Sequence, residues 1–243
     1  MNGRIIYAIG DIHGEHDRLV ELHDAINAHW RLEGEGRPAT LIHMGDYVDR
    51  GPDSFKVIDR LIALQKEFEG DADGFEVICL MGNHEKLMLD ALVHAAPTAM
   101  TMWLKNGGDK TLESYARIAP PDTPRHKAVP ITHLDWLASL PSKLLRREDG
   151  LLFVHAGVRP DSFPNCDESV WLWTRANDFM DDAQWPWNPE LDPLTVVHGH
   201  TPTDDGEPYV GARRINLDTG AVYGGKLTAG VFMPGEKVRF LSV

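Results

Sequence analysis

Residues 40–51 read TLIHMGDYVDRG, an apolar run followed at once by a turn that carries two aspartates and an arginine. The apolar part, residues 40–44, predicts a buried strand. Asp46, Asp49 and Arg50 follow where that strand ends, and hydrophobic packing gives no reason for them. Open α/β sheets bind ligands at the carboxyl ends of their strands, so this stretch favours that fold class with a site at the sheet edge. The alternative for Asp49 and Arg50 is an ion pair on a surface loop, which is common and weak.

Four other short stretches place polar residues just past an apolar run in the same way. They are residues 10–14 (GDIHG), 82–85 (GNHE), 155–157 (HAG) and 198–200 (HGH). Together with the first stretch they supply Asp, His, Asn and Arg side chains. Mixed oxygen and nitrogen ligands suit a pair of divalent transition metals. A metal pair beside an arginine and an unligated histidine suits the hydrolysis of a phosphate ester.

Strands and helices alternate along the chain, which supports an α/β arrangement. Apolar residues at helical spacing predict helices over residues 15–30, 54–68 and 85–95. Apolar runs predict strands over residues 4–9, 40–44, 75–81, 151–154 and 194–197. We expect residues 213–217, 227–232 and 238–241 to form strands of a second, more antiparallel sheet.

Two long segments lack this alternation. Residues 96–141 contain many prolines, carry no strand signal and hold candidate helices over 98–104 and 110–115, so we interpret them as a cap-like helical insertion. Residues 160–193 form a long connection rich in tryptophan. Such a connection is either functional, for example a lid, or its tryptophans pack the loop against the core.

Composition indicates an ordinary globular enzyme rather than a nucleic-acid or membrane-surface protein. The 243 residues suffice for one large domain with a sizeable core. The net charge of −13 argues against nucleic-acid and anionic-membrane partners, which reward basic patches. An anionic substrate stays compatible with this charge, because two divalent cations would make the site itself positive.

The two cysteines imply no disulfide framework and favour a reducing compartment. Cys79 lies in an apolar run and is interpreted as a buried small hydrophobe, whereas Cys166 lies in a polar loop. The first apolar stretch, residues 4–9, is too short for a signal-peptide core, and no run approaches the length of a membrane helix. We therefore expect a cytoplasmic protein.

Several candidate ligands also have structural alternatives. Asp11 and His13 are two residues apart, which places them on one side of an extended segment while Ile12 turns into the core. Asp11 is equally suited to cap the following helix. Asp46 is the candidate for bridging two metals, because a carboxylate has two oxygens. Asn83 suits either a metal ligand or a helix N-cap, and the two roles are compatible.

Two further histidines would complete such a site. His155 and His200 each end an apolar run, and His198 is a weaker candidate. His84, next to Asn83, would point toward substrate and protonate a leaving oxygen. Asp49 would fix the tautomer of His84 and raise its pKa.

The five stretches, in this order, resemble the phosphoprotein-phosphatase branch of the calcineurin-like metallophosphoesterases, and bacterial serine/threonine phosphoprotein phosphatases in particular. The resemblance covers about residues 4–228. It implies a central β-sandwich flanked by helices (αββα), in a single domain spanning residues 1–243 with the helical insertion at about 96–141. The tail at 216–220 and 224–227 is also similar to bacterial members, and we interpret it as a strand pair that shapes the site wall.

Carried over residue by residue, the resemblance implies a two-metal site. One metal would be held by Asp11, His13 and Asp46, and the other by Asp46, Asn83, His155 and His200. His84 would be the general acid, oriented by Asp49, and Arg50 and Arg175 would bind the substrate phosphate. Manganese is the first expectation for the metals, with Fe, Zn, Co or Ni also compatible with these ligands.

The expected reaction is two-metal-dependent hydrolysis of phosphomonoesters, by direct attack of a metal-bridging hydroxide on phosphorus. The first substrate expectation is phospho-Ser/Thr in proteins, or another small phosphoester. The alternative is a dinucleoside polyphosphate such as diadenosine tetraphosphate. Symmetrically cleaving bacterial hydrolases of that substrate tend to have Ala at the position of Asp49, so the aspartate favours the phosphatase modestly. A third possibility is a non-catalytic metal-binding or phosphopeptide-binding module, for which a positioned acid would have no use.

Overall fold

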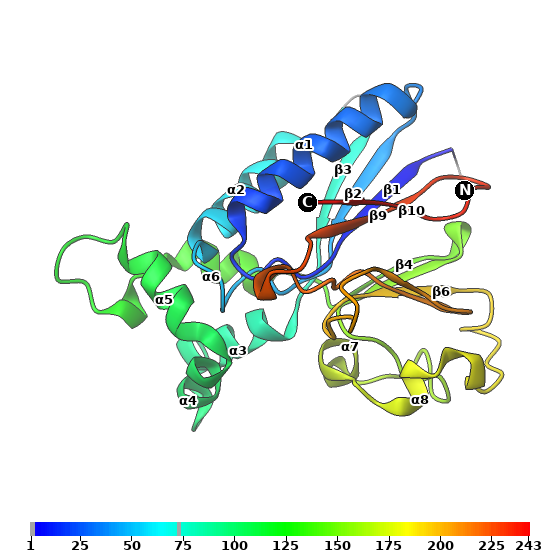
Figure 1. The fold of residues 1–243 in the computed structure, drawn as a ribbon. Helices are drawn as coiled ribbons and strands as arrows, with labels where there is room; N and C mark the ends of the chain where they lie inside the picture. Colours follow the sequence, from blue (N-terminus) through cyan, green and yellow to red (C-terminus); the bar gives the residue numbers. More distant parts are fainter. Residues whose placement is uncertain (1–2, 72–73) are drawn as a thin grey trace.

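Two five-stranded β-sheets pack face to face, and helices cover the outer side of each sheet (Figure 1). The structure is a computed structural model that describes residues 3–71 and 74–243. The expected α/β fold, a central β-sandwich flanked by helices, is confirmed.

The first sheet has the strand order β10-β9-β1-β2-β3. Its strands are β1 (Ile5–Ile9), β2 (Ala39–His43), β3 (Phe75–Cys79), β9 (Thr228–Phe232) and β10 (Arg239–Ser242). β1, β2 and β3 run parallel, whereas β9 is antiparallel to β1 and β10 is antiparallel to β9. The helices α1 (His16–Glu33) and α2 (Ser54–Glu67) are the crossover connections that parallel neighbours require, and they lie on one face of this sheet.

The second sheet has the order β4-β5-β6-β8-β7. Its strands are β4 (Lys143–Arg146), β5 (Leu151–Val154), β6 (Thr195–His198), β7 (Tyr209–Val210) and β8 (Arg214–Asn216). β5, β6 and β8 run parallel, and β4 and β7 are antiparallel edge strands. The short helices α7 (Glu168–Trp173) and α8 (Asn177–Met180) lie on its outer side.

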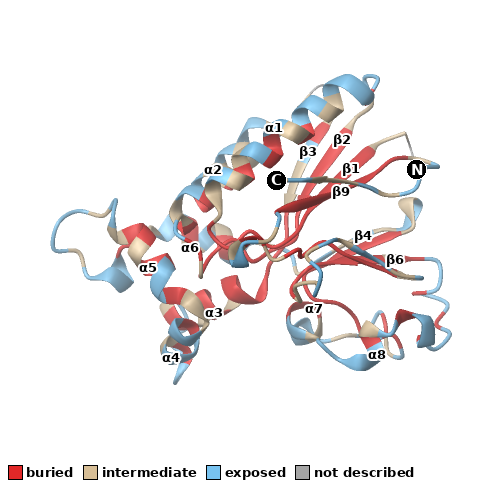
Figure 2. Cartoon of the chain, viewed as in Figure 1, coloured by how far each residue is buried: buried red, intermediate tan, exposed pale blue. Residues whose placement is uncertain are grey.

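The side chains of the central strands alternate between two hydrophobic layers. In β1, Ile5, Tyr7 and Ile9 pack with the helices, while Ile6 and Ala8 pack between the two sheets. All of them are buried, which accounts for the unbroken apolar run in the sequence (Figure 2).

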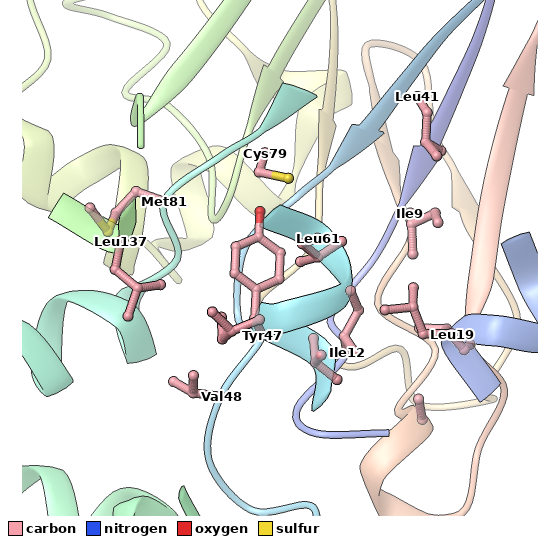
Figure 3. Close-up of a cluster of buried hydrophobic side chains, with 14 of the residues drawn as sticks. Ile9, Ile12, Leu19, Leu41, Tyr47, Val48, Leu61, Cys79, Met81 and Leu137 are labelled. Carbon is pink, nitrogen blue, oxygen red and sulfur yellow. The ribbon is translucent and has the colours of Figure 1, made fainter. Parts of the chain in front are cut away.

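The carboxyl ends of the parallel strands from both sheets meet along one edge. Turns leave β1, β2 and β3 at this edge, and other turns leave β5 and β6. Ile12 lies in the turn after β1, and Tyr47 and Val48 lie in the turn after β2. All three side chains are fully buried in the cluster drawn in Figure 3, so their packing holds both turns in place. The expectation that Ile12 turns into the core is confirmed.

Two strands belong to a different sheet from the one the sequence predicted. Residues 227–232 and 238–241 were expected in the second sheet, but β9 and β10 extend the first sheet beside β1. Residues 213–217 do join the second sheet, where β8 is parallel to β6 and not antiparallel. The local hydrophobic pattern predicts that a segment forms a strand. Long-range packing decides which strand it pairs with.

The segment between β3 and β4 is helical. After α3 (Asn83–Leu92) come α4 (Ala99–Trp103), the π-helical turn η1 (Leu104–Gly108), α5 (Asp109–Ala116), the 3-10 turn η2 (Arg125–Lys127) and α6 (Ile131–Ala138). The π-helical turn lies between the two helices predicted over residues 98–104 and 110–115, and in it Gly107 has φ 97°. The sequence reading missed α6 and the edge strand β4. No helix in the described ranges has the length and apolar character needed to span a membrane.

Glu85 ties the turn after β2 to the start of α3. Its buried carboxylate accepts hydrogen bonds from the backbone N–H groups of Asp46 (2.8 Å), Tyr47 (2.7 Å), Val48 (3.2 Å) and Gly82 (2.9 Å). Burial and the charge of Asp46 raise the pKa of Glu85 to about 7, and the backbone donors oppose that shift. One carboxylate therefore satisfies four otherwise unpaired backbone groups.

We predict that Glu85→Gln lowers the free energy of unfolding by about 2–4 kcal/mol. The amide has one acceptor oxygen in place of two, so buried N–H groups lose their partner, at roughly 1–3 kcal/mol each. Urea denaturation would measure the change. Glu207→Gln, an exposed carboxylate paired with Lys226, is the matched control and should change stability by less than about 0.5 kcal/mol. Equal stability of the two variants would contradict this role of Glu85.

Candidate active site

The turns at the shared edge hold their polar residues in an uncommon backbone conformation. Five non-glycine residues of these turns have positive φ, between 45° and 72°: His13, Asp46, Asp49, Arg50 and His200. A left-handed backbone costs a side-chain-bearing residue free energy, and such residues cluster at functional sites. The conformation aims these side chains away from the core and toward one another.

Close approach of the turns requires glycine at two places. A Cβ on Gly82 would lie 2.3 Å from Asp46 Oδ1, and a Cβ on Gly199 would lie 2.2 Å from Asp11 Oδ1. Neither distance is sterically possible, so these glycines allow the carboxylates to sit against the neighbouring turn.

Asp46 lies between two groups of convergent ligand atoms. Its Oδ2 is 3.4 Å from His13 Nε2 on one side and 3.4 Å from His155 Nε2 on the other. His84 Nε2 completes the first group at 4.0 Å from Asp46 Oδ2, and His200 completes the second. All of these residues are buried. The central place of Asp46 is the one that a bridging ligand needs.

Asn83 belongs to the second group. Its Oδ1 lies 2.8 Å from His200 Nδ1 and 2.9 Å from His155 Nε2. Its side chain makes no cap to α3, whose N-cap residue is Gly82. Of the two roles considered from sequence, the placement favours that of a ligand.

The backbone selects which imidazole nitrogen faces the site. Nδ1 of His13 is 2.7 Å from the carbonyl oxygen of Val48, and Nδ1 of His155 is 3.0 Å from that of Met44. Each Nδ1–H donates to its carbonyl, which leaves Nε2 for the site. This second layer of contacts is typical of metal-binding histidines.

Asp11 lies beside the two groups. Both of its oxygens accept the His200 backbone N–H, at 3.0 and 3.1 Å, and it does not cap α1, whose N-cap is Glu15. Burial raises the pKa of Asp11 well above its usual range, and the charges of Asp218 and Asp46 raise it further. A cation here would relieve that repulsion.

Asp218 is a site residue that the sequence reading missed, since residues 216–220 were interpreted only as a structural wall. Its carboxylate is buried and accepts the Gly220 backbone N–H at 3.1 Å. Burial raises its pKa to about 6, Asp46 raises it as well, and Arg50 lowers it. The available signal is its position just after the strand predicted over residues 213–217, the same rule that identifies the other stretches.

His84 and Asp49 form a buried pair. His84 Nδ1 is 2.7 Å from Asp49 Oδ2, and both residues are inaccessible to solvent. Trp103 Nε1 donates to both Asp49 oxygens at 2.9 and 3.0 Å, and Thr111 Oγ1 donates to Oδ1 at 2.7 Å. Burial raises the pKa of Asp49, and the donors from His84, Thr111 and Trp103 oppose this. The surface ion pair considered for Asp49 and Arg50 is therefore not how Asp49 is used.

Trp103 and Thr111 come from the helical insertion, and nothing in the local sequence pointed to them. They make the insertion part of the support for the Asp49–His84 pair.

The two candidate phosphate-binding arginines lie at opposite ends of the ligand set. Arg50 Nη1 is 2.5 Å from His13 Nε2, and Arg175 Nε donates to His200 Nε2 at 3.1 Å. His198 stands outside the set, because its Nε2 accepts from Arg214 at 3.0 Å. The cationic group of Arg50 occupies the direction of the His13 lone pair, which a metal ion would also take.

The donor chemistry fits a pair of divalent metals. Carboxylate, amide and imidazole atoms converge from five turns, with backbone carbonyls fixing two of the imidazoles. Burying this many lone pairs together without a cation is unfavourable. The residues present do not select among Mn, Fe, Zn, Co and Ni.

Comparison with known proteins agrees with this geometry. The family model for calcineurin-like phosphoesterases matches residues 5–228. This chain therefore belongs to the calcineurin-like phosphoesterase family.

More particular likenesses come from individual proteins. The chain is 26% identical over 237 residues to the bis(5'-nucleosyl)-tetraphosphatase PrpE [asymmetrical] of Geobacillus thermodenitrificans, covering 91% of this chain and 87% of that protein. It is 28% identical over 239 residues to the protein of the same name from Bacillus cereus, with the same coverage. A solved serine/threonine phosphatase from Saccharomyces cerevisiae superposes with a TM-score of 0.60 at 16% identity, covering 100% of this chain and 80% of that one, which is a likeness of fold.

We predict that metal binding releases a proton at neutral pH. Burial by itself lowers the pKa of His155, but the carboxylates of Asp46 and Asp11 raise it to about 10. In chelator-treated protein His155 is therefore protonated at pH 7, and a metal at Nε2 must displace that proton. Metal affinity should rise with pH throughout the range below the pKa of His155.

Calorimetric titration in buffers of different ionisation enthalpy would measure the released protons. Binding with no proton release and no pH dependence between about pH 6 and 8 would contradict this assignment.

Proposed function

We propose that this protein hydrolyses dinucleoside polyphosphates, with diadenosine tetraphosphate as the representative substrate, at a two-metal centre. The observation that carries the catalytic part is the placement of the Asp46 carboxylate between two buried groups of ligand atoms. The observation that favours this substrate over phospho-Ser/Thr is the name shared by the curated relatives, which match nearly the whole chain.

Each site residue has a distinct task in this proposal. Asp11, His13 and Asp46 hold one metal, and Asp46, Asn83, His155 and His200 hold the other. The metals, when bound, lower the pKa of a water nucleophile and neutralise the phosphoryl oxygens. Asp49 orients His84, which donates a proton to the leaving oxygen as the phosphorus–oxygen bond breaks.

The arginines complete the binding of the substrate. Arg50 and Arg175 stand at the two ends of the ligand set and would bind phosphoryl oxygens. Metal binding at His13 Nε2 would release Arg50 from that nitrogen, so the guanidinium becomes available to the substrate.

Two exposed aromatic rings accompany the arginines. The guanidinium of Arg50 lies 5.7 Å from the ring centroid of Tyr223, which is 64% exposed. Trp173 is 40% exposed, and its ring lies 6.3 Å from that of His200. Exposed rings beside a phosphate site suit nucleobases, which stack on aromatic side chains. This supports a nucleotide substrate, as do the relatives.

We predict that kcat/KM for diadenosine tetraphosphate exceeds that for a phosphoserine peptide by at least about tenfold. The longer ligand would reach the metals and also the arginines and exposed aromatic rings beside them. Assays with added manganese on both substrates and on nitrophenyl phosphate would test it. Products of ATP and AMP would match the asymmetrical cleavage in the relatives' names, and two ADP would not.

A preference for the phosphopeptide would restore the Ser/Thr phosphatase as the main function. Absence of turnover on all three substrates, with each of the candidate metals, would favour a binding module.

We predict that His84→Asn reduces turnover by about 10²–10⁴-fold on a phosphoserine peptide, the usual contribution of a general acid. The loss on diadenosine tetraphosphate should be smaller, because a departing phosphate oxygen is a weaker base than an alkoxide. His94→Asn makes the same chemical change at an exposed residue two positions past the end of α3 and should leave both rates unchanged.

Metal content separates the acid from a ligand. Full metal occupancy in the His84→Asn protein agrees with a general acid, whereas loss of one metal would identify His84 as a ligand, consistent with its place near His13 and Asp46.

A further inference from the structure

A basic cavity opens beside Arg50, on the side of the helical insertion. Its volume is about 560 Å³. It lies between the turn after β2, helix α5 and the 3-10 turn η2, and its charged lining residues are Arg50, Lys110, Glu113, Arg117 and Arg125. Four cationic side chains therefore face one carboxylate, in a chain whose net charge is −13.

The cations of this cavity are only partly neutralised. Lys110 pairs with Glu113 at 3.0 Å, and Arg117 pairs with Asp53 at 3.1 Å. Arg125 is exposed and makes no ion pair within 4 Å in the part of the chain that the structure describes. The cavity thus keeps an excess of positive charge, which attracts an extended anion.

Arg50 is shared by the cavity and the candidate active site. That residue lines the cavity while its Nη1 contacts His13 Nε2, and its backbone N–H donates to the carbonyl oxygen of Gly107 at 3.2 Å. His84, the proposed acid, lies on the same side, with its ring 4.6 Å from that of His13. The proposed acid and Arg50 therefore both lie beside His13, at the end of the candidate active site that adjoins this cavity.

We propose that the cavity is a binding subsite for the polyphosphate chain of the leaving group, with Arg125 and Lys110 contacting phosphates that do not react. The inference rests on the proposed function, because the phosphates beyond the reacting one are the groups that the cavity would bind. A phosphomonoester places its one phosphate on the metals and leaves the cavity unfilled. The insertion would then select substrates by the length of their phosphate chain.

The variant that tests this is Arg125→Glu. It should raise KM for diadenosine tetraphosphate by about tenfold, as expected for loss of a charge-assisted hydrogen bond, with little change in kcat. Hydrolysis of nitrophenyl phosphate should be unchanged. Calorimetry supplies a readout without turnover: affinity for non-hydrolysable imidotriphosphate should fall about tenfold, and affinity for orthophosphate should stay the same. Lys110→Gln should act in the same direction.

Arg31→Glu is the matched control, because it makes the same charge change in the last turn of α1, at the far end of that helix from the site. It should alter none of these values. An unchanged affinity of Arg125→Glu for imidotriphosphate, or equal losses for imidotriphosphate and orthophosphate, would overturn the subsite.

The outcomes also separate this inference from the proposed function. If the unaltered protein cleaves diadenosine tetraphosphate and Arg125→Glu leaves its KM and the imidotriphosphate affinity unchanged, only the subsite fails. If the protein prefers a phosphopeptide while imidotriphosphate binding still depends on Arg125, the proposed substrate fails and the polyphosphate-binding cavity stands. If Arg125→Glu weakens binding of an acidic phosphopeptide but not of imidotriphosphate, the cavity recognises peptide and the inference is overturned.

Discussion

The meeting of parallel strand ends from two different sheets is the constraint on which the rest of this structure depends. A single parallel sheet presents a row of turns along one edge, and here a second sheet presents its own row to the first. Candidate ligands from the turns after β1, β2 and β3 can then face candidate ligands from the turns after β5 and β6 across a few ångströms. No one segment of the chain holds a complete ligand set, so the site exists only when both sheets are packed.

The turns at this edge keep a backbone conformation that costs free energy. Each non-glycine residue with positive φ costs roughly 1–3 kcal/mol, and several of them adjoin one another after β2. The buried carboxylate of Glu85 accepts hydrogen bonds from this turn, and the side chains of Tyr47 and Val48 pack in the core. These contacts offset the conformational cost. The same residues that stabilise the fold here therefore fix the positions of Asp46, Asp49 and Arg50.

Local pattern predicts most of the helices and strands and most residues of the candidate site. The unbroken apolar run of β1 and the helical spacing in α2 are set by neighbours in sequence, and polar residues after each strand mark the candidate ligands. The sheet predicted for β9 was wrong, because an apolar strand fits either sheet and only long-range packing decides between them. Trp103 and Thr111 could not be found, since their hydrogen bonds to Asp49 join residues more than fifty positions apart. Asp218 also follows a predicted strand, as the candidate ligands do, but the sequence analysis assigns its neighbours to a wall of the site.

The helical insertion connects chemistry and selectivity in this molecule. Trp103 of α4 and Thr111 of α5 donate to Asp49, and Asp49 contacts His84 in turn. Residues of α5 and η2 in the same insertion, from Lys110 to Arg125, line the basic cavity beside Arg50. A metal centre that hydrolyses phosphate esters is indifferent to what lies beyond the reacting phosphorus, because its contacts are to phosphoryl oxygens. Discrimination must then come from groups outside the metal centre, and the insertion is where this chain places charged groups next to it. Because one segment would both support the proposed acid and face the proposed leaving group, we expect changes in it to alter the choice of substrate without altering the candidate metal ligands.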